Sequence, residues 1–224
     1  MLLKIPGVLN QAQLEKIEQV VAGAEFIDGK LSAGMAAQRV KENEELKPER
    51  ESMTLLIRIL LSALSHNATF NSAVLPVRMA DPIIARYRSG MAYGEHVDDA
   101  IMGSSGPRLR SDISMTLFLR DPQHYDGGEL VVRTSFGETE VKLAAGDAVV
   151  YPSSSLHRVA EVTRGERLVA LFWIQSHVRD AAQRELLFEL NQAREQLLRQ
   201  SAEAESSKLV DRAFSNLVRM WSEV

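Results

Sequence analysis

Short extended segments fill the middle of the chain, and they constrain the fold more than any other feature. Between Pro76 and Ser176, runs rich in Val, Ile, Leu, Tyr and Phe alternate with Gly, Pro, Asp and Ser. This pattern is typical of strands separated by turns, and many short strands at regular spacing indicate a β-sandwich or a jelly roll. The expected strands are residues 82–89, 113–119, 129–134, 138–143, 147–151, 156–162 and 167–175.

Helical patterns precede this region. Asn10 stands before apolar residues at helical spacing, with Gln13 in the position of a capping-box partner, so residues 11–22 should form a helix. A second helix should run from Pro48 to about Ser65. The charge-rich run 41–50 is expected to be mainly a solvated linker.

Helical spacing returns after Ser176 in two stretches separated by the polar residues 201–207. We expect a helical hairpin whose apolar faces pack on the core, on each other or on a second copy of the chain, as in a homo-oligomer. The apolar residues are Leu186, Leu190, Ala193 and Leu197 in the first stretch, and Val210, Phe214, Leu217 and Trp221 in the second.

The whole pattern predicts a mainly β protein with flanking helices. Its core would be a jelly roll (a double-stranded β-helix) at residues 76–177, between an N-terminal helical and mixed segment, 1–75, and a C-terminal helical extension, 178–224. We prefer the two-sheet jelly roll to a sandwich because it can bring strands that are distant in sequence into one mouth.

Composition excludes several classes of function. The formal net charge of −4 over 224 residues gives no electrostatic reason to expect a nucleic-acid partner. Without cysteine the chain has no disulfide, zinc–thiolate site or cysteine nucleophile. The first residues lack a signal-peptide pattern, and the most apolar segment, 55–64, contains Arg58. We therefore expect a cytoplasmic protein with no membrane partner.

Three residues, all of types that commonly bind metal ions, form a candidate metal site. His96 and Asp98 are two positions apart, so their side chains point to the same side of an extended chain. His157 lies 61 positions after His96 (157 minus 96), so only a fold that joins two separate strands could unite the three. Two histidines and one carboxylate are the ligand set that holds Fe(II) and leaves coordination positions open. Arg167 follows, with a planar guanidinium that can pair bidentately with a carboxylate.

Several motifs around these residues resemble a known family. In order along the chain, the motifs are Ala85-Arg86-Tyr87-Arg88-Ser89-Gly90, His96-Val97-Asp98, Thr116-Leu117-Phe118-Leu119, Tyr125-Asp126-Gly127-Gly128-Glu129-Leu130, Ala145-Gly146-Asp147, Tyr151-Pro152-Ser153-Ser154-Ser155-Leu156-His157, Arg164-Gly165-Glu166-Arg167 and Val178-Arg179-Asp180-Ala181-Ala182-Gln183-Arg184. They look like those of the Fe(II)/2-oxoglutarate-dependent dioxygenases related to prolyl 4-hydroxylases, and together they resemble the bacterial PKHD-type hydroxylases over nearly the whole chain.

The resemblance implies a set of roles. His96, Asp98 and His157 would hold Fe(II), and Arg167 would bind the distal carboxylate of 2-oxoglutarate with a hydroxyl donor from Tyr87. If Arg167 is not that anchor, Arg158 or Arg164 is the next choice. The reaction would use O₂ to hydroxylate a prolyl residue or a small molecule such as a siderophore, releasing succinate and CO₂. L-ascorbate is implied as a further cofactor.

Neighbouring residues carry weaker expectations. Asp99 should face away from Asp98 by strand alternation, and the glycine-rich segment 101–110 should be a mobile loop over the site. We expect His66, His124 and His177 to be structural or exposed.

Two other classes share part of the pattern. A nucleic-acid demethylase of the same superfamily would have the triad, but it typically carries a basic face and a second arginine six positions after the cosubstrate arginine, where this chain has Trp173. A non-enzymatic metal- or sugar-binding cupin usually has H-x-H with a glutamate and a third histidine instead of H-x-D.

Overall fold

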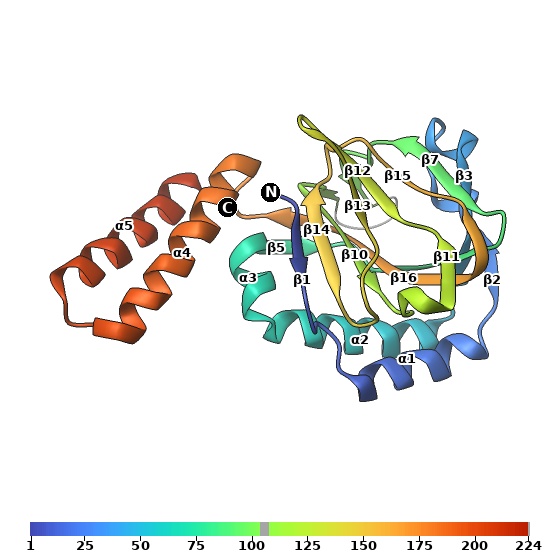
Figure 1. Cartoon of the computed structure of the whole chain (residues 1–224), viewed down its shortest axis with the longest axis horizontal. Helices are drawn as coiled ribbons and strands as arrows, with labels where there is room; N and C mark the ends of the chain where they lie inside the picture. The colour runs from blue at the N-terminus through green and yellow to red at the C-terminus, as the bar shows by residue number, and fades with distance from the viewer. Residues whose placement is uncertain (104–107, 224) are drawn as a thin grey trace.

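Two β-sheets pack face to face in the computed structural model, which describes residues 1–103 and 108–223, without the side chain of Arg50 (Figure 1). The larger sheet has the order β1 (Leu3–Ile5), β14 (Ala148–Pro152), β10 (Ile113–Phe118), β16 (Val162–Ser176), β6 (Ile83–Arg88), β4 (Glu44–Leu46) and β2 (Phe26–Asp28), with β5 (Pro76–Met79) and β11 (Tyr125–Gly127) also paired to β16. The smaller sheet has the order β13 (Gly137–Val141), β12 (Leu130–Thr134), β15 (His157–Val159), β7 (Ala92–His96) and β3 (Lys41–Glu42). The predicted jelly-roll core with flanking helices is confirmed.

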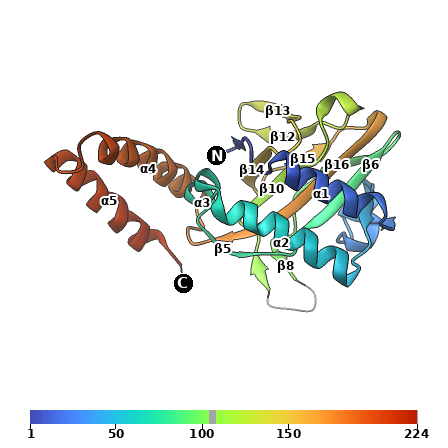
Figure 2. The same cartoon turned by 90° about the horizontal axis from the view of Figure 1, so that it is seen from below.

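Three helices cover the outer face of the larger sheet: α1 (Gln11–Ala22), α2 (Arg50–His66) and α3 (Ala68–Val74) (Figure 2). The predicted capping box starts α1, because Asn10 accepts from the backbone N–H of Gln13 and the Gln13 side chain accepts from the backbone N–H of Asn10. The second predicted helix, α2, begins at Arg50 rather than Pro48. It buries leucines at four-residue spacing: Leu56, Leu60 and Leu64.

The central strand, β16, is longer than predicted. It begins at Val162 rather than residue 167. The sequence prediction missed residues 162–166 because this polar stretch has no strand-like alternation. At Gly165, with φ of +76°, the backbone is so close to β11 that a Cβ would lie 2.1 Å from the carbonyl oxygen of His124. The strand predicted at 156–162 is correspondingly shorter, ending at Val159.

The charged run 41–50 is not the solvated linker that its composition predicts. Lys41 and Glu45 are 5% and 7% exposed and form an ion pair of 2.5 Å. Their strands, β3 and β4, pair with β7 and β6: β3 is an edge strand of the smaller sheet, and β4 lies next to the edge strand β2 of the larger one. The two charges neutralise each other, which allows both to be buried.

The glycine-rich segment 101–110 is not a loop at its ends. Strands β8 (Ile101–Met102) and β9 (Leu109–Arg110) pair with each other. The tip predicted to cover the site, residues 104–107, lies outside the described residues.

The C-terminal hairpin consists of α4 (Ala181–Ser201) and α5 (Glu205–Trp221), which pack together and extend away from the sheets, with α4 also contacting α3 (Figure 1). On α4 the predicted apolar face is partly wrong, since Leu186 is 56% exposed and Ala193 is also exposed. The buried face includes two hydrogen-bonded polar residues that an apolar pattern cannot find. Its members are Arg184, Leu187, Phe188 and Asn191.

The second helix of the hairpin agrees better with its pattern. Val210, Phe214, Leu217 and Trp221 on α5 are all half-buried. Beyond the end of α5, Glu223 forms an ion pair at the surface of the jelly-roll domain, where its carboxylate lies 2.7 Å from the guanidinium of Arg110 on β9. The hairpin is thus attached to the body of the protein at both ends.

No single helix among the described residues is long and apolar enough to cross a membrane. By length and composition alone α2 together with α3 would reach that threshold, but the pair is bent by 81°.

The buried face of α4 can be tested on two adjacent leucines. Leu187→Ala should lower the free energy of unfolding by about 2–5 kcal/mol, since Leu187 is 1% exposed. Leu186→Ala should change it by less than about 0.5 kcal/mol, since Leu186 is largely exposed. Urea denaturation of both variants would measure the difference, and equal effects would contradict the assigned face.

Candidate active site

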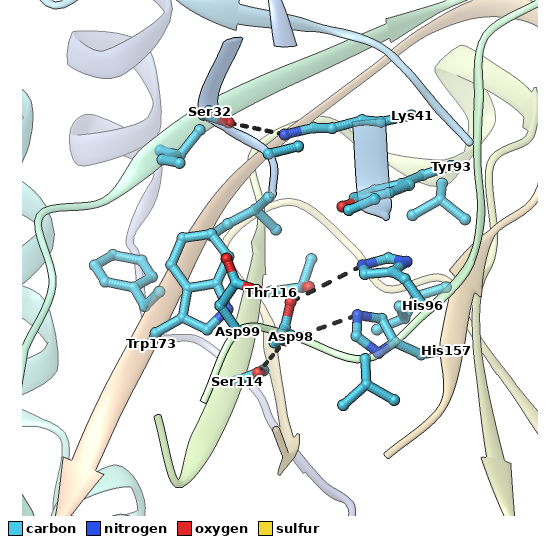
Figure 3. Close-up of a pocket in the computed structure, with 18 of the residues that line it drawn as sticks. Ser32, Lys41, Tyr93, His96, Asp98, Asp99, Ser114, Thr116, His157 and Trp173 are labelled. Atoms are coloured by element: carbon cyan, nitrogen blue, oxygen red, sulfur yellow. Dashed lines mark hydrogen bonds and ion pairs between the residues drawn. The ribbon is translucent and has the colours of Figure 1, made fainter. Parts of the chain in front are cut away.

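A cavity of about 120 Å³ lies between the two sheets, and Figure 3 shows the residues around it. Strands of both sheets line it, and the segment from Ser32 to Ala37 closes one side. Most of the lining is apolar. All five residues predicted for the site face this cavity: Tyr87, His96, Asp98, His157 and Arg167.

The two histidines are neighbours across a strand pair. His96 is the last residue of β7 and lies directly opposite His157 on β15. The pairing of these strands therefore brings together two histidines that are far apart in sequence. The Nε2 atoms of His96 and His157 lie 3.9 and 3.8 Å from the carboxylate oxygens of Asp98 (Figure 3). Each of the three residues can offer one ligand atom, and these atoms lie within 4.8 Å of one another. This spacing fits a single metal ion.

Backbone contacts fix the orientation of both imidazoles. Nδ1 of His96 lies 2.8 Å from the carbonyl oxygen of Gly94, and Nδ1 of His157 lies 3.0 Å from that of Ser155. A carbonyl only accepts, so Nδ1 carries the proton and the Nε2 lone pair faces Asp98. Burial, with a smaller contribution from nearby His157, lowers the pKa of His96 to about 4, so this ring is neutral at pH 7.

Two serines support the carboxylate. Ser114 on β10 donates a hydrogen bond to Oδ2 of Asp98, and its hydroxyl lies 2.8 Å from that of Ser153. Ser114 and Thr116 both line the cavity from a strand that is otherwise apolar and fully buried. Sequence reasoning missed them, although polar residues two positions apart in such a strand are a usable signal.

Asp99 does not face away, as strand alternation predicts, but lines the same cavity as Asp98 (Figure 3). The reason is that β7 ends at His96, so the following residues are not held in an extended strand.

The guanidinium of Arg167 is buried beside Tyr87. The two residues are cross-strand partners on β16 and β6, and Arg167 is 1% exposed. Among the described residues, Nε and Nη1 of Arg167 have no hydrogen-bond partner. Burial raises the pKa of Tyr87 to about 12, so its hydroxyl remains protonated and can donate. This end of the cavity can bind a carboxylate.

The alternative anchors are engaged elsewhere. Arg158 donates to Glu138 at 3.0 Å and Arg164 to Asp126 at 2.6 Å, and neither arginine lines the cavity. Of the other histidines, His66 and His124 are exposed, and none of the three, His177 included, lines the cavity.

Further cavity residues carried no recognised signal in the sequence. Tyr93 stacks on His96, with ring centroids 3.6 Å apart, and Lys41 reaches the cavity from the run expected to be solvated. Trp173, which sits where a demethylase would have its second arginine, lines the cavity with an indole N–H that is buried and without a partner among the described residues.

Comparison with known proteins agrees with this arrangement. Residues 82–175 match the family model of the 2OG-Fe(II) oxygenase superfamily. The chain is 50% identical to a PKHD-type hydroxylase of Thioalkalivibrio sulfidiphilus and 45% identical to one of Picosynechococcus sp., in both cases over 100% of each chain.

Solved structures share the fold. A prolyl-4-hydroxylase from Pseudomonas putida has a TM-score of 0.53 at 20% identity, covering 78% of this chain and 92% of that one. HygX from Streptomyces hygroscopicus, solved with nickel and 2-oxoglutarate bound, has a TM-score of 0.56 at 15% identity, covering 78% and 82%. Sequence identity to the full-length relatives decides the family: this chain is a PKHD-type hydroxylase, a 2-oxoglutarate- and Fe(II)-dependent dioxygenase.

Proposed function

We propose that His96, Asp98 and His157 ligate the iron, and that Arg167 and Tyr87 bind the distal carboxylate of 2-oxoglutarate. One observation carries the proposal: the buried guanidinium of Arg167, without a partner among the described residues, lines the same cavity as the histidine–carboxylate cluster. The cosubstrate would bind iron at one end and a cationic side chain at the other. It therefore requires a metal site and an anion-binding site in the same cavity.

The donor set fits Fe(II). Two imidazoles and one carboxylate are the facial-triad ligands, and they leave coordination positions free. The backbone carbonyls behind both rings and the Ser114 hydroxyl behind Asp98 hold these donors in place. A cupin-type site would need a further histidine, and the described residues place none in the cavity.

The protein's own residues would bind and orient the cosubstrate and exclude water from the cavity. Arg167 and the Tyr87 hydroxyl would fix the cosubstrate at its far end, so that its other end meets the histidines. Apolar residues such as Leu171 and Val159 limit water around the reacting groups. When bound, iron with 2-oxoglutarate and O₂ supplies the oxidation that yields succinate, CO₂ and a hydroxylated substrate.

The substrate we propose is a prolyl residue or a small molecule, with L-ascorbate as the reductant that keeps the iron ferrous. The Pseudomonas putida relative in fold is a prolyl-4-hydroxylase, and HygX has been solved with hygromycin B, a small molecule, bound. A screen that follows both succinate release and a mass gain of about 16 Da, one oxygen atom, would separate hydroxylation from uncoupled turnover.

The metal assignment predicts a graded loss of affinity. Ser114→Ala, which removes a hydrogen bond to a ligand, should weaken Fe(II) binding about 10-fold to 100-fold. His157→Ala and Asp98→Ala remove ligands and should weaken it further. Anaerobic Fe(II) titration would measure both effects.

The matched control is His124→Ala, because His124 is exposed and outside the cavity. It should bind iron as the wild type does. Normal iron binding by Asp98→Ala would rule out the assignment.

The cosubstrate assignment predicts a large loss at Arg167. Arg167→Ala removes one partner of a buried charged pair, which costs about 2–5 kcal/mol. The affinity for 2-oxoglutarate, measured at saturating Fe(II), should therefore fall roughly 30-fold to several-thousand-fold. Arg167→Lys keeps the charge without the fork and should lose less.

Arg164→Ala is the control, since that arginine is exposed and paired with Asp126. Its affinity for 2-oxoglutarate should not change. A loss of less than about threefold in Arg167→Ala, under about 1 kcal/mol, would mean that Arg167 is not the anchor.

A further inference from the structure

The side chain of Asp99 is a charged group of the cavity with no role in the proposed chemistry. It follows the metal ligand Asp98 directly and lines the cavity. Its backbone is held, because the Ser111 hydroxyl donates to the Asp99 carbonyl oxygen and the Ser111 N–H donates to that of Ala100. A Cβ on Gly34 would lie 3.3 Å from both carboxylate oxygens, so the carboxylate rests against the 32–37 wall.

No hydrogen bond or ion pair joins this carboxylate to a described residue, and the proposed function gives it no partner either, unlike the other charged groups of the cavity. Lys41 is paired with Glu45. Asp98 is assigned to the iron and Arg167 to 2-oxoglutarate. The two positive charges of Fe(II) offset the two negative charges of the cosubstrate, and Asp98 offsets Arg167. The loaded cavity therefore keeps one net negative charge, that of Asp99.

The surroundings of Asp99 favour a cation. Asp99 and Trp173 both line this cavity, and both are labelled in Figure 3. The face of an indole ring attracts cations. The buried indole N–H of Trp173 can donate to an acceptor near that cation.

We propose that Asp99 binds a positively charged group of the substrate, so that this enzyme acts on compounds carrying an ammonium or guanidinium group. The inference rests on the proposed function, because the charge balance assumes iron and 2-oxoglutarate in their assigned places. Asp99 is exposed, so water weakens the pair. The expected preference for a cation over a neutral isostere is about tenfold.

The test uses three probes of similar length that differ in charge: n-pentylammonium, 1-pentanol and pentanoate. They are titrated onto protein loaded with Mn(II) and saturating 2-oxoglutarate, without oxygen. The paramagnetic ion broadens the NMR signals of probes that bind next to it, which gives their affinities at this site alone. We expect n-pentylammonium to bind about tenfold more tightly than 1-pentanol, and pentanoate to bind least.

Two substitutions assign the preference to Asp99. Asp99→Asn should lower the affinity for n-pentylammonium to that for 1-pentanol, and Asp99→Lys should make pentanoate the best of the three probes. Glu95→Gln is the matched control, with the same change of charge four positions earlier. Glu95 is paired with Arg133 outside the cavity, so its loss should leave the preference intact.

The possible results distinguish a failure of this inference from a failure of the proposed function on which it rests. Wild-type protein that fails to bind Mn(II) and 2-oxoglutarate would contradict the proposed function and this inference with it. Protein that binds both but does not distinguish the probes would contradict the role of Asp99 alone. So would an Asp99→Asn variant that keeps the preference, or a Glu95→Gln variant that loses it.

Discussion

The cavity is built around a buried positive charge. β16 runs through the middle of the larger sheet and carries Arg167, whose isolated charge would cost several kcal/mol to bury. The faces of Tyr87 and Phe118 lie 5.0 and 5.7 Å from its guanidinium carbon and relieve part of that cost. Gly128 makes room, since a Cβ there would lie 3.1 Å from Cδ of Arg167. With the proposed binding mode, a carboxylate from 2-oxoglutarate would neutralise the charge, so the cosubstrate would complete the protein interior as well as the reaction.

The helices and strands could be predicted where the local residue pattern agrees with the environment of those residues in the folded protein. Helix α1 matches residue for residue, because its cap and apolar spacing are both local. β7 was missed, since its sequence, Ala-Tyr-Gly-Glu-His, has no apolar alternation and owes its strand conformation to pairing with β3 and β15. The prediction of the buried face of α4 was partly wrong for a related reason. Arg184 and Asn191 are buried with hydrogen bonds to their polar groups, and a search for apolar spacing does not detect such residues.

The residues of the site divide in the same way. The metal and cosubstrate candidates stand in recognisable motifs, so the sequence predicts them. The residues expected to meet the substrate do not, because their positions depend on where strands end and on which segments close the cavity. Alternation places Asp99 on the wrong side once β7 has ended. Lys41 gave no sign of burial, since its partner Glu45 belongs to the same charged run.

The cross-strand pairing of His96 with His157 has a consequence for stability. These histidines join β7 and β15, strands of only five and three residues, so an ion bound by both is also a cross-link within the smaller sheet. A ligand that binds only the folded chain stabilises it by about 2.7 kcal/mol at a concentration 100 times its dissociation constant. With the proposed ligands, a bound ion would therefore raise the free energy of unfolding, and the metal-free enzyme would be the less stable form of the same fold.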